Sequence, residues 1–189
     1  MSFDREAAER AVHDLLTALG HPPSGNAELD RTAERVVAAL HEDLLSGHGV
    51  DALSLIEHGS SERPPRDERD VVWVRGLTTA CVCPHHLTPA WGSADVAYAP
   101  GARLLGLGTI AELVDAYARR LTFQEAIGDS VTAALMQFAR AEGAFCRLRL
   151  RHGCLCARGA RQAHAEVETI SARGTLAYLA DGQNAPERR

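Results

Sequence analysis

Apolar positions in the first sixty residues recur at helical spacing. Over residues 4–19 and 28–46 they fall three or four apart, which places them on one face of an α-helix. Gly20 and the prolines after it end the first pattern, and Gly47 ends the second. We therefore predict that residues 1–58 form an amino-terminal helical extension.

A polar, proline-bearing segment, residues 59–70, follows and is interpreted as a linker. Beyond it the periodicity changes. It predicts strands over 71–80 and 94–99, helices over 109–120 and 122–141, and strands over 144–151 and 163–171. The order β-β-α-α-β-β predicts an α+β domain over residues 71–175. Residues 176–189 are expected to form a polar tail.

Composition adds mainly exclusions. The 189 residues are 46% apolar and 24% charged, with a net charge of −5 and no basic block, so we expect a globular protein with no nucleic-acid partner. All 20 cationic side chains are Arg, which excludes Schiff-base chemistry and a Walker-type phosphate loop. No apolar run approaches the ~20 residues of a membrane span. We expect no secretory signal, because no basic start followed by an apolar stretch is found. We expect a cytoplasmic protein with no membrane partner.

Four of the five cysteines form two tight pairs, Cys81/Cys83 and Cys154/Cys156. In a reducing compartment such pairs indicate metal ligation or chemistry more than disulfides. Each pair lies beside histidine, in the runs Cys83-Pro-His85-His86 and His152-Gly-Cys154. The sequence therefore predicts that its chemistry resides in these two clusters.

The spacing of these residues is compatible with a catalytic Zn²⁺ site. Cys83 and His86 are three residues apart, so a tight turn can direct both at one ion, and Cys154 can supply the third ligand from a neighbouring strand. His85 and His152 would then lie beside the metal as free imidazoles suited to proton transfer. Two other interpretations of the same spacing stay open: a structural four-thiolate zinc site, and buried packing without a metal.

The wider context resembles the GTP cyclohydrolase I family. Cys83-Pro-His85-His86-Leu-Thr-Pro-Ala-Trp-Gly begins the resemblance. It continues through Leu105-Gly-Leu107, Phe123-Gln124-Glu125 and His152-Gly-Cys154-Leu-Cys-Ala-Arg158-Gly. Thr32-Ala-Glu-Arg35-Val also echoes the start of the family pattern. The similarity covers roughly residues 28–175.

This resemblance implies a set of roles, a fold and an assembly. The implied zinc ligands are Cys83, His86 and Cys154, the catalytic imidazoles His85 and His152, the guanine-binding residues Gln124 and Glu125, and the triphosphate-binding residues Arg158 and Arg35. The implied fold is the tunnelling fold, assembled as a homo-oligomeric ring, commonly a decamer of two pentamers with active sites between subunits.

The implied activity is that of a cyclic amidine hydrolase. A guanine nucleotide is opened at C8 with release of formate, and the complete reaction gives dihydroneopterin triphosphate for pterin and tetrahydrofolate biosynthesis. Three positions depart from the family pattern: Pro84 replaces a glutamate, Gly108-Thr109 replaces Ser-Lys, and Glu112 replaces a basic residue. These changes favour, as an alternative, a guanine nucleoside, monophosphate or modified base as substrate. A non-catalytic ring protein that binds a purine or pterin is a third hypothesis.

Overall fold

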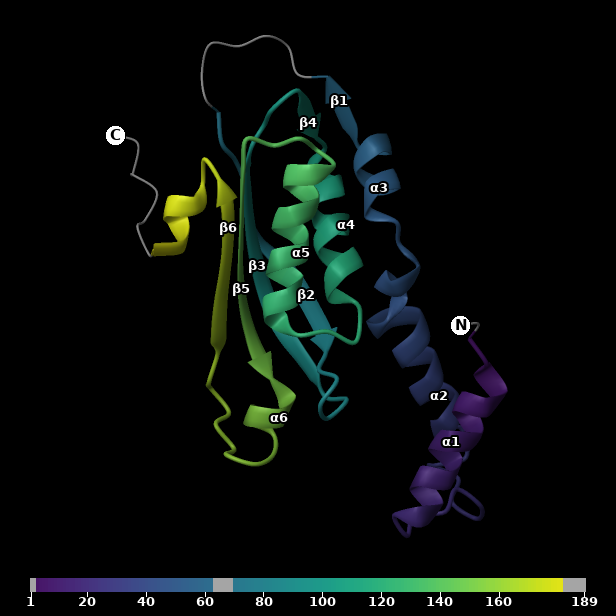
Figure 1. Cartoon of the computed structure of the whole chain (residues 1–189). Coiled ribbons are helices and arrows are strands. Elements are labelled where there is room, and N and C mark those ends of the chain that lie inside the picture. The colour runs from purple at the N-terminus through teal and green to yellow at the C-terminus, as the bar shows by residue number, and fades with distance from the viewer. Residues whose placement is uncertain (1–2, 63–69, 182–189) are drawn as a thin grey trace. The chain divides into compact units, whose positions relative to one another are not determined.

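The computed structural model describes residues 3–62 and 70–181. The chain divides into two compact units, Met1–Ser46 and Gly47–Arg189. Within the described residues, no helix is both long and apolar enough to cross a membrane. The β-β-α-α-β-β order predicted from periodicity is confirmed in the second unit (Figure 1).

The first unit contains α1 (Arg5–Ala18), α2 (Thr32–Ala38) and a π-helical turn, η1 (Ala39–Leu44). Asp4 begins α1 by accepting a hydrogen bond from the Ala7 N–H at 2.9 Å. The helix predicted over 28–46 begins only at Thr32, because residues 26–32 form successive turns. Arg5 on α1 donates to Glu42 on η1 at 2.6 Å, which ties the two helical segments together. A 3-10 turn, η2 (Ser46–Gly49), follows.

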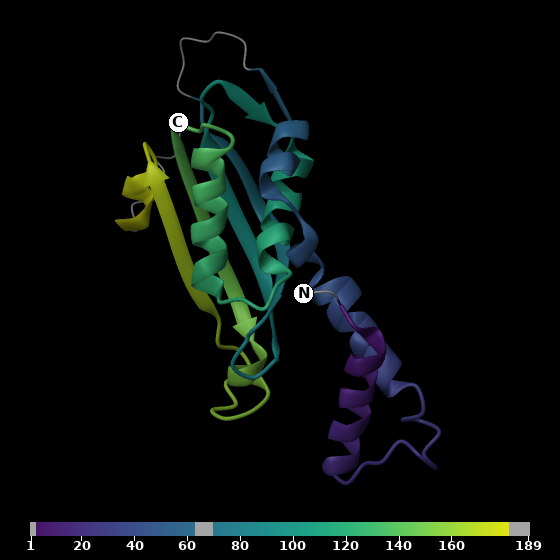
Figure 2. The ribbon, with the colours of Figure 1, turned by 45° about the vertical axis from the view of Figure 1, so that its right-hand side comes forward.

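The second unit is built on a four-stranded antiparallel sheet. Its strands are β2 (Val72–Val82), β3 (Pro89–Ala99), β5 (Gly143–His152) and β6 (Val167–Gly174), in the spatial order β2-β3-β5-β6. Helices α4 (Leu107–Ala118) and α5 (Gln124–Gln137) cover one face of this sheet (Figures 1 and 2). The main core lies between these two layers, where Ile110, Ile127 and Leu148 are fully buried.

One short helix and two short strands are among the elements that were not predicted. Helix α3 (Ala52–His58) is capped by Asp51 and buries Ile56 in the main core. Strand β1 (Ser60–Glu62) pairs with β4 (Arg103–Leu105) in a separate antiparallel ribbon. Helix α3 thus belongs to the second unit, and the expected linker begins with a paired strand; its residues 63–69 lie outside the described part of the chain.

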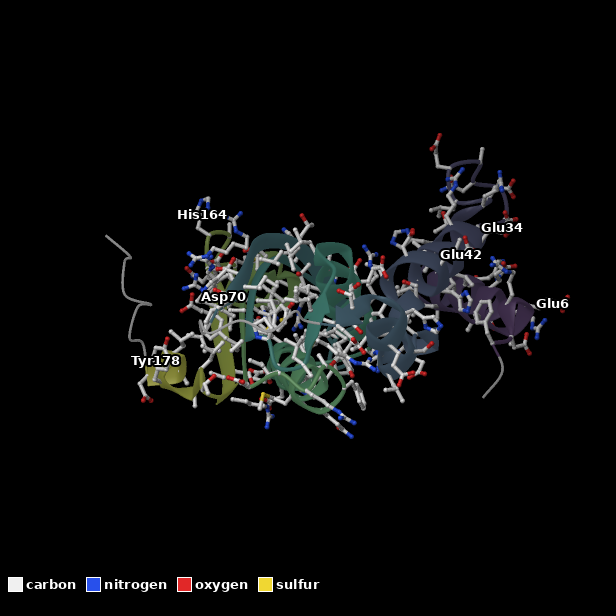
Figure 3. All side chains as sticks on the ribbon, turned by 90° about the horizontal axis from the view of Figure 1, so that it is seen from above. Glu6, Glu34, Glu42, Asp70, His164 and Tyr178 are labelled. Carbon is white, nitrogen blue, oxygen red and sulfur yellow. The ribbon has the colours of Figure 1, made fainter. Side chains whose placement is uncertain are left out.

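The other face of the sheet carries a smaller core. Leu176 and Leu179 are buried against Ala97 and Phe145. They flank the start of the 3-10 helix η3 (Ala177–Asp181), whose Tyr178 is 43% exposed (Figure 3). Residues 176–181 therefore pack on the sheet where a polar tail was expected, because two leucines three residues apart share one face of the turn. Residues 182–189 lie outside the described part of the chain.

A buried charge fixes β2, β3 and β5 on that second face. Asp95 is 3% exposed and accepts hydrogen bonds from Arg147 at 2.6 Å and from Arg149 at 3.0 Å. It also accepts from the N–H of Gly76, at 2.9 Å, where β2 bulges and the chain adopts φ = 70°. Glycine is suited to this bulge because a side chain is strained at positive φ.

Candidate functional site

The predicted cysteine and histidine clusters meet at one end of the sheet. Residues 83–88 form the turn from β2 to β3, and β5 runs directly into the short helix α6 (Gly153–Cys156). The strand register pairs Val82 with Pro89 and Ala90 with His152, so the turn and α6 are neighbours although about 70 residues separate them (Figure 1).

Backbone hydrogen bonds define the turn. The Leu87 N–H donates to the Cys83 carbonyl at 2.9 Å, and the Cys83 N–H donates to the Thr88 carbonyl at 3.1 Å. Leu87 has φ = 52°, a conformation that is uncommon for a branched side chain and that is held here by these bonds. Cys83 is half-buried, whereas His85 and His86 are exposed with their ring centroids 6.3 Å apart.

The start of α5 lies against the end of β2. The Thr122 N–H donates to the Val82 carbonyl at 3.1 Å, in a short bridge that lies directly before the helix. Phe123 is the N-cap residue of α5, and its ring centroid is 4.9 Å from that of His85. Glu125 is exposed in the first turn of the helix, where the helix dipole favours a carboxylate.

Electrostatics place Glu125 and Cys83 in the same neighbourhood. Burial raises the pKa of the Cys81 thiol, with smaller contributions from nearby negative charge on Cys83 and Glu125, to about 11 in all. Cys81 is 1% exposed and therefore stays a neutral thiol at pH 7, whereas Cys83 and Cys154 are only half-buried. These differences favour Cys83 and Cys154 over Cys81 as thiolate ligands.

Gln124 lies on the buried side of the same helical turn. It is 2% exposed, and its side-chain nitrogen donates to the carbonyls of Leu148, at 3.0 Å, and Val167, at 2.9 Å. Its side-chain oxygen is 2.8 Å from Nε2 of His152. The sequence suggested Gln124 as a guanine contact and gave no sign of these bonds, which depend on where β5 and β6 meet α5.

Helix α6 packs tightly on the β2–β3 turn. A Cβ atom added at Gly153 would lie 2.9 Å from the Pro89 carbonyl oxygen and 3.3 Å from Cβ of Thr88, so only glycine fits at this crossing. Cys154 and Cys156 follow, and Cys156 Sγ contacts the Ala165 carbonyl at 3.8 Å. Arg158 is exposed beyond the helix, and Arg35 is exposed on α2 of the first unit.

The donor set at this end fits zinc in kind. Two half-buried thiols and an imidazole are ligands that zinc prefers, and three protein ligands leave one position open. Thr88 Oγ1 is buried in the same turn and has no hydrogen-bond partner among the described residues. Within residues 3–62 and 70–181, however, no group of three or more His, Cys, Asp and Glu side chains is arranged to hold a metal ion.

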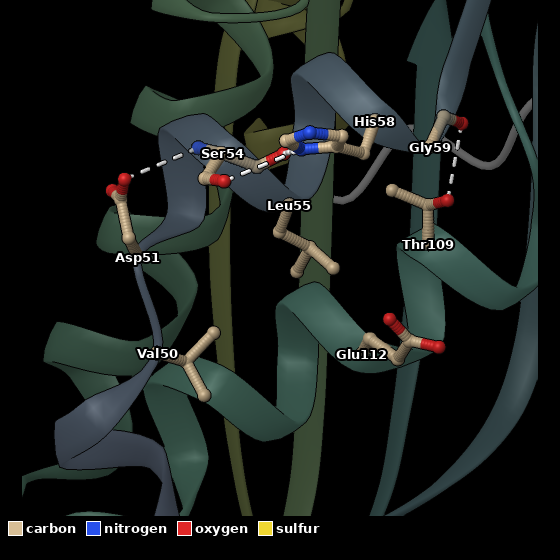
Figure 4. A pocket seen from close by; sticks show the side chains of 8 residues that line it. All are labelled: Val50, Asp51, Ser54, Leu55, His58, Gly59, Thr109 and Glu112. Atoms are coloured by element: carbon tan, nitrogen blue, oxygen red, sulfur yellow. Dashed lines mark hydrogen bonds between the residues drawn. The ribbon is translucent and has the colours of Figure 1, made fainter.

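A separate pocket of about 510 Å³ lies between α3 and α4 (Figure 4). Thr109, at the position where the family resemblance expects lysine, is 8% exposed and donates its hydroxyl hydrogen to the Gly59 carbonyl at 3.1 Å. Asp51, His58 and Glu112 also line the pocket. Asp51 accepts from the Ser54 N–H as the cap of α3.

Comparison with known proteins points to one family. The family model described as GTP cyclohydrolase I matches residues 8–185. The GTP cyclohydrolase 1 of Ralstonia nicotianae is 39% identical over 154 residues, covering 82% of this chain and 71% of that protein. The GTP cyclohydrolase 1 of Chromobacterium violaceum is 36% identical over 96% of this chain and 86% of its own length, and that of Leifsonia xyli is 37% identical over 93% and 90%.

These matches, together with the α+β fold, establish the class of protein: this chain is a hydrolase that acts on a cyclic amidine. It belongs to the GTP cyclohydrolase I family. The resemblance inferred from the Cys83–His86 and His152–Arg158 motifs is thereby confirmed.

Proposed function

We propose that this chain is a zinc-dependent cyclohydrolase that opens the imidazole ring of a guanine nucleotide at C8 and releases formate. The complete reaction would give dihydroneopterin triphosphate. One observation carries the proposal: the turn over 83–88, the start of α5 and the β5–α6 junction meet at one end of the sheet. Family membership supports the reaction class.

Cys83, His86 and Cys154 would hold the zinc ion. When bound there, zinc would supply Lewis acidity that makes water a competent nucleophile near neutral pH. The tight contact of Gly153 with Thr88 and Pro89 supports this ligand set, because it brings the Cys154 segment onto the turn that carries the other two ligands.

Glu125 would recognise the base. A carboxylate accepts two parallel hydrogen bonds from guanine N1–H and the 2-amino group, and adenine offers no such pair. The exposure of Glu125 in the first turn of α5 supports this role. Its charge and that of Cys83 both raise the pKa of Cys81, which places Glu125 near the proposed ligand Cys83. Arg158 and Arg35 would contact the phosphates.

Two imidazoles would move the protons. His152 would protonate N7 of the base, which makes C8 electrophilic, and His85 would serve later transfers. The contact of His85 with Phe123 supports its part, because it places the ring beside the helical turn that carries Glu125. His152 is held on the same turn through Gln124.

A homo-oligomeric ring, built as two pentamers, would complete the tunnelling fold. The sheet supports such an assembly because β2 and β6 are its end strands, with 11 and 8 residues, and long edge strands are templates for pairing with another chain. Measuring the mass of the intact particle by light scattering tests this proposal: a monomer at micromolar concentration would contradict it.

A substrate panel tests the reaction. The zinc-loaded protein is incubated with GTP, GMP, guanosine and guanine, and formate and pterin fluorescence are both measured. Formate and fluorescence with GTP alone would support the complete reaction. Formate without fluorescence would indicate an enzyme that stops after ring opening, and no formate from any compound would contradict the proposal.

A second candidate function is ring opening of a guanine derivative without a triphosphate. The α3–α4 pocket favours it, because the Thr109 hydroxyl is bonded within the protein and two carboxylates, Asp51 and Glu112, line the same space. Carboxylates repel a polyanion.

If the phosphates approach this pocket, Glu112→Arg should lower KM for GTP by about tenfold, the effect of one charge-assisted contact, with no change for guanosine. Equal KM values for GTP in both proteins would mean that the phosphates do not approach this pocket, and the pocket would then give this candidate no support.

A further inference from the structure

Gln124 is bonded on three sides although it occupies a position expected to face the substrate. Its two amide hydrogens have acceptors in two strands, the carbonyl of Leu148 in β5 and that of Val167 in β6. Its oxygen contacts His152 Nε2 at 2.8 Å. With 2% of its surface exposed, the side chain spans α5, β5 and β6 from inside the protein.

The two carbonyls fix which way the amide points. A carbonyl oxygen can only accept, so the side-chain atom facing Leu148 and Val167 must be the NH₂ group. The reversed amide would bring its oxygen to about 3 Å from both carbonyl oxygens with no hydrogen between them, and bury that repulsion. The oxygen of Gln124 is therefore the atom next to His152.

The fixed amide in turn determines the proton position on His152. An amide oxygen only accepts, so Nε2 of His152 must carry the hydrogen in the contact of 2.8 Å. In the neutral ring the other nitrogen, Nδ1, then has the free lone pair. The second partner of an imidazole selects its tautomer in the same way at other sites.

We infer that Gln124 is a positioning residue that holds His152 as the Nε2–H tautomer, so that His152 exchanges its catalytic proton through Nδ1. This inference rests on the proposed function for the direction of the transfer. The Nδ1–H bond breaks as N7–H forms, and the electron pair stays on Nδ1. The neutral ring that remains is the Nε2–H tautomer, so the bond to Gln124 persists through the transfer and no side chain has to rotate.

Two adjacent residues of α5 thus have different roles. Gln124 is buried toward the sheet and holds His152, whereas Glu125 is exposed and available to the base. Consecutive residues of a helix point about 100° apart, so one helical turn can serve both the interior and the site. The two residues should consequently give opposite kinetic signatures when they are changed.

The kinetic test compares Gln124→Met with Thr132→Val in the full-length, zinc-loaded protein. Thr132 is the matched control because it is also a fully buried polar residue of α5 and is hydrogen-bonded to Ser171 of β6. None of the hydrogen bonds described for Thr132 involves His152. We expect Gln124→Met to lower kcat about 100-fold, the lower range for a general acid, with KM changed less than twofold. Thr132→Val should keep kcat within twofold. A KM raised tenfold or more by Gln124→Met at unchanged kcat would overturn the inference and make Gln124 a substrate contact.

A spectroscopic test needs no turnover. Nitrogen-15 NMR of the wild-type protein, with the His152 signal identified by its absence in His152→Asn, reports which ring nitrogen carries the hydrogen in the neutral form. We expect Nε2–H in the wild type and a mixture of tautomers in Gln124→Met. A wild-type ring with the hydrogen on Nδ1 would overturn the inference even if Gln124→Met fails to fold. If no guanine compound is opened, the proposed function fails while this spectrum still decides the tautomer.

Discussion

Two regions of the second unit differ in how many of their polar side chains are exposed and how many are hydrogen-bonded within the protein. At the Cys/His end of the sheet, the Gln124 side chain is hydrogen-bonded within the protein, whereas His85 and Glu125 are exposed. In the α3–α4 pocket, Thr109 is bonded to Gly59, and the carboxylate of Glu112 shares the space (Figure 4). The first region keeps side chains available for chemistry, and the second uses its central residue to join α4 to the end of α3.

This difference separates two parts of substrate recognition. Residues that the family resemblance assigns to the base and its opening are present at the first region. At the second region, Thr109 and Glu112 stand where the family pattern has a lysine and a basic residue, although the two arginines that the resemblance assigns to the triphosphate, Arg158 and Arg35, are present. We therefore expect changes at the first region to affect turnover, and changes at the second to affect stability or the phosphate tail alone.

The largest effect should follow from Cys154→Ala. Loss of a thiolate ligand should release the zinc and lower formate production at least about 100-fold, since the loss of an outer partner of a metal ligand already costs up to that much. Zinc content by mass spectrometry and formate release are measured together. Cys156→Ala is the matched control, two residues further along α6, and should keep both. A zinc-loaded, active Cys154→Ala protein would contradict the ligand assignment.

Glu125→Gln should have the next largest effect. The amide cannot accept both hydrogen bonds of the guanine edge, and a hydrogen bond to a charged group is worth about 1.5–3 kcal/mol. We expect kcat/KM to fall about 10- to 150-fold, with zinc content unchanged. Asp129→Asn changes an exposed carboxylate one turn later on α5 and should keep kcat/KM within twofold. Equal losses in the two variants would mean that Glu125 makes no special contact.

Asp95 should set the acid stability of the sheet that carries both regions. Burial alone would raise the pKa of Asp95, but hydrogen bonds from Arg147 and Gly76 and the charges of Arg147 and Arg149 outweigh it, so the pKa lies below its usual value. A lowered folded-state pKa stabilises the protein above the unfolded-state pKa of about 3.9, and this stabilisation is lost as pH falls through the folded-state pKa.

Urea unfolding as a function of pH measures this contribution. Asp95→Asn should lower the free energy of unfolding at pH 7 by about 1.5–3 kcal/mol, and the gap between wild type and variant should close below about pH 4. The activity per folded molecule should stay within twofold because Asp95 lies on the sheet face opposite α4 and α5. A gap that stays constant from pH 7 to pH 2.5 would contradict the lowered pKa.

Thr109→Val should have the smallest effect. It removes the hydrogen bond to the Gly59 carbonyl, which should lower the free energy of unfolding by about 1 kcal/mol, and leave kcat and KM within twofold. Denaturation and steady-state kinetics on one preparation measure both. If KM for the preferred substrate instead rises tenfold, Thr109 contacts the substrate and the contrast between the two regions fails.

The sequence predicted the order of the main strands and helices because an element that is buried on one face has apolar residues at regular intervals. On β5, Cys146, Leu148 and Leu150 alternate with arginines and are fully buried against the helices. Helix α3 and the β1–β4 ribbon have seven and three residues per element, which is too short for a period to be recognised. Their positions depend on an Asp51 cap and on packing against residues far along the chain.

For the candidate site, residue type and spacing predicted that the chemistry resides in two Cys/His clusters, and the strand register brings those two segments together. The ligand set Cys83, His86 and Cys154 stays a prediction. The bonds of Gln124 could not be predicted, because its partners Leu148 and Val167 contribute only backbone carbonyls and leave no mark in the sequence. The same holds for Thr109, whose partner is the carbonyl of a glycine 50 residues away.

The most direct measurement follows the carbon that the reaction removes. Guanine nucleotide labelled with carbon-13 at C8 is incubated with the zinc-loaded protein, and labelled formate is quantified by NMR. We predict one labelled formate per nucleotide consumed, and no labelled formate from Cys154→Ala. A protein that binds one zinc per chain yet yields no labelled formate from GTP, GMP or guanosine would contradict the claim that this cysteine–histidine end of the sheet opens a purine ring.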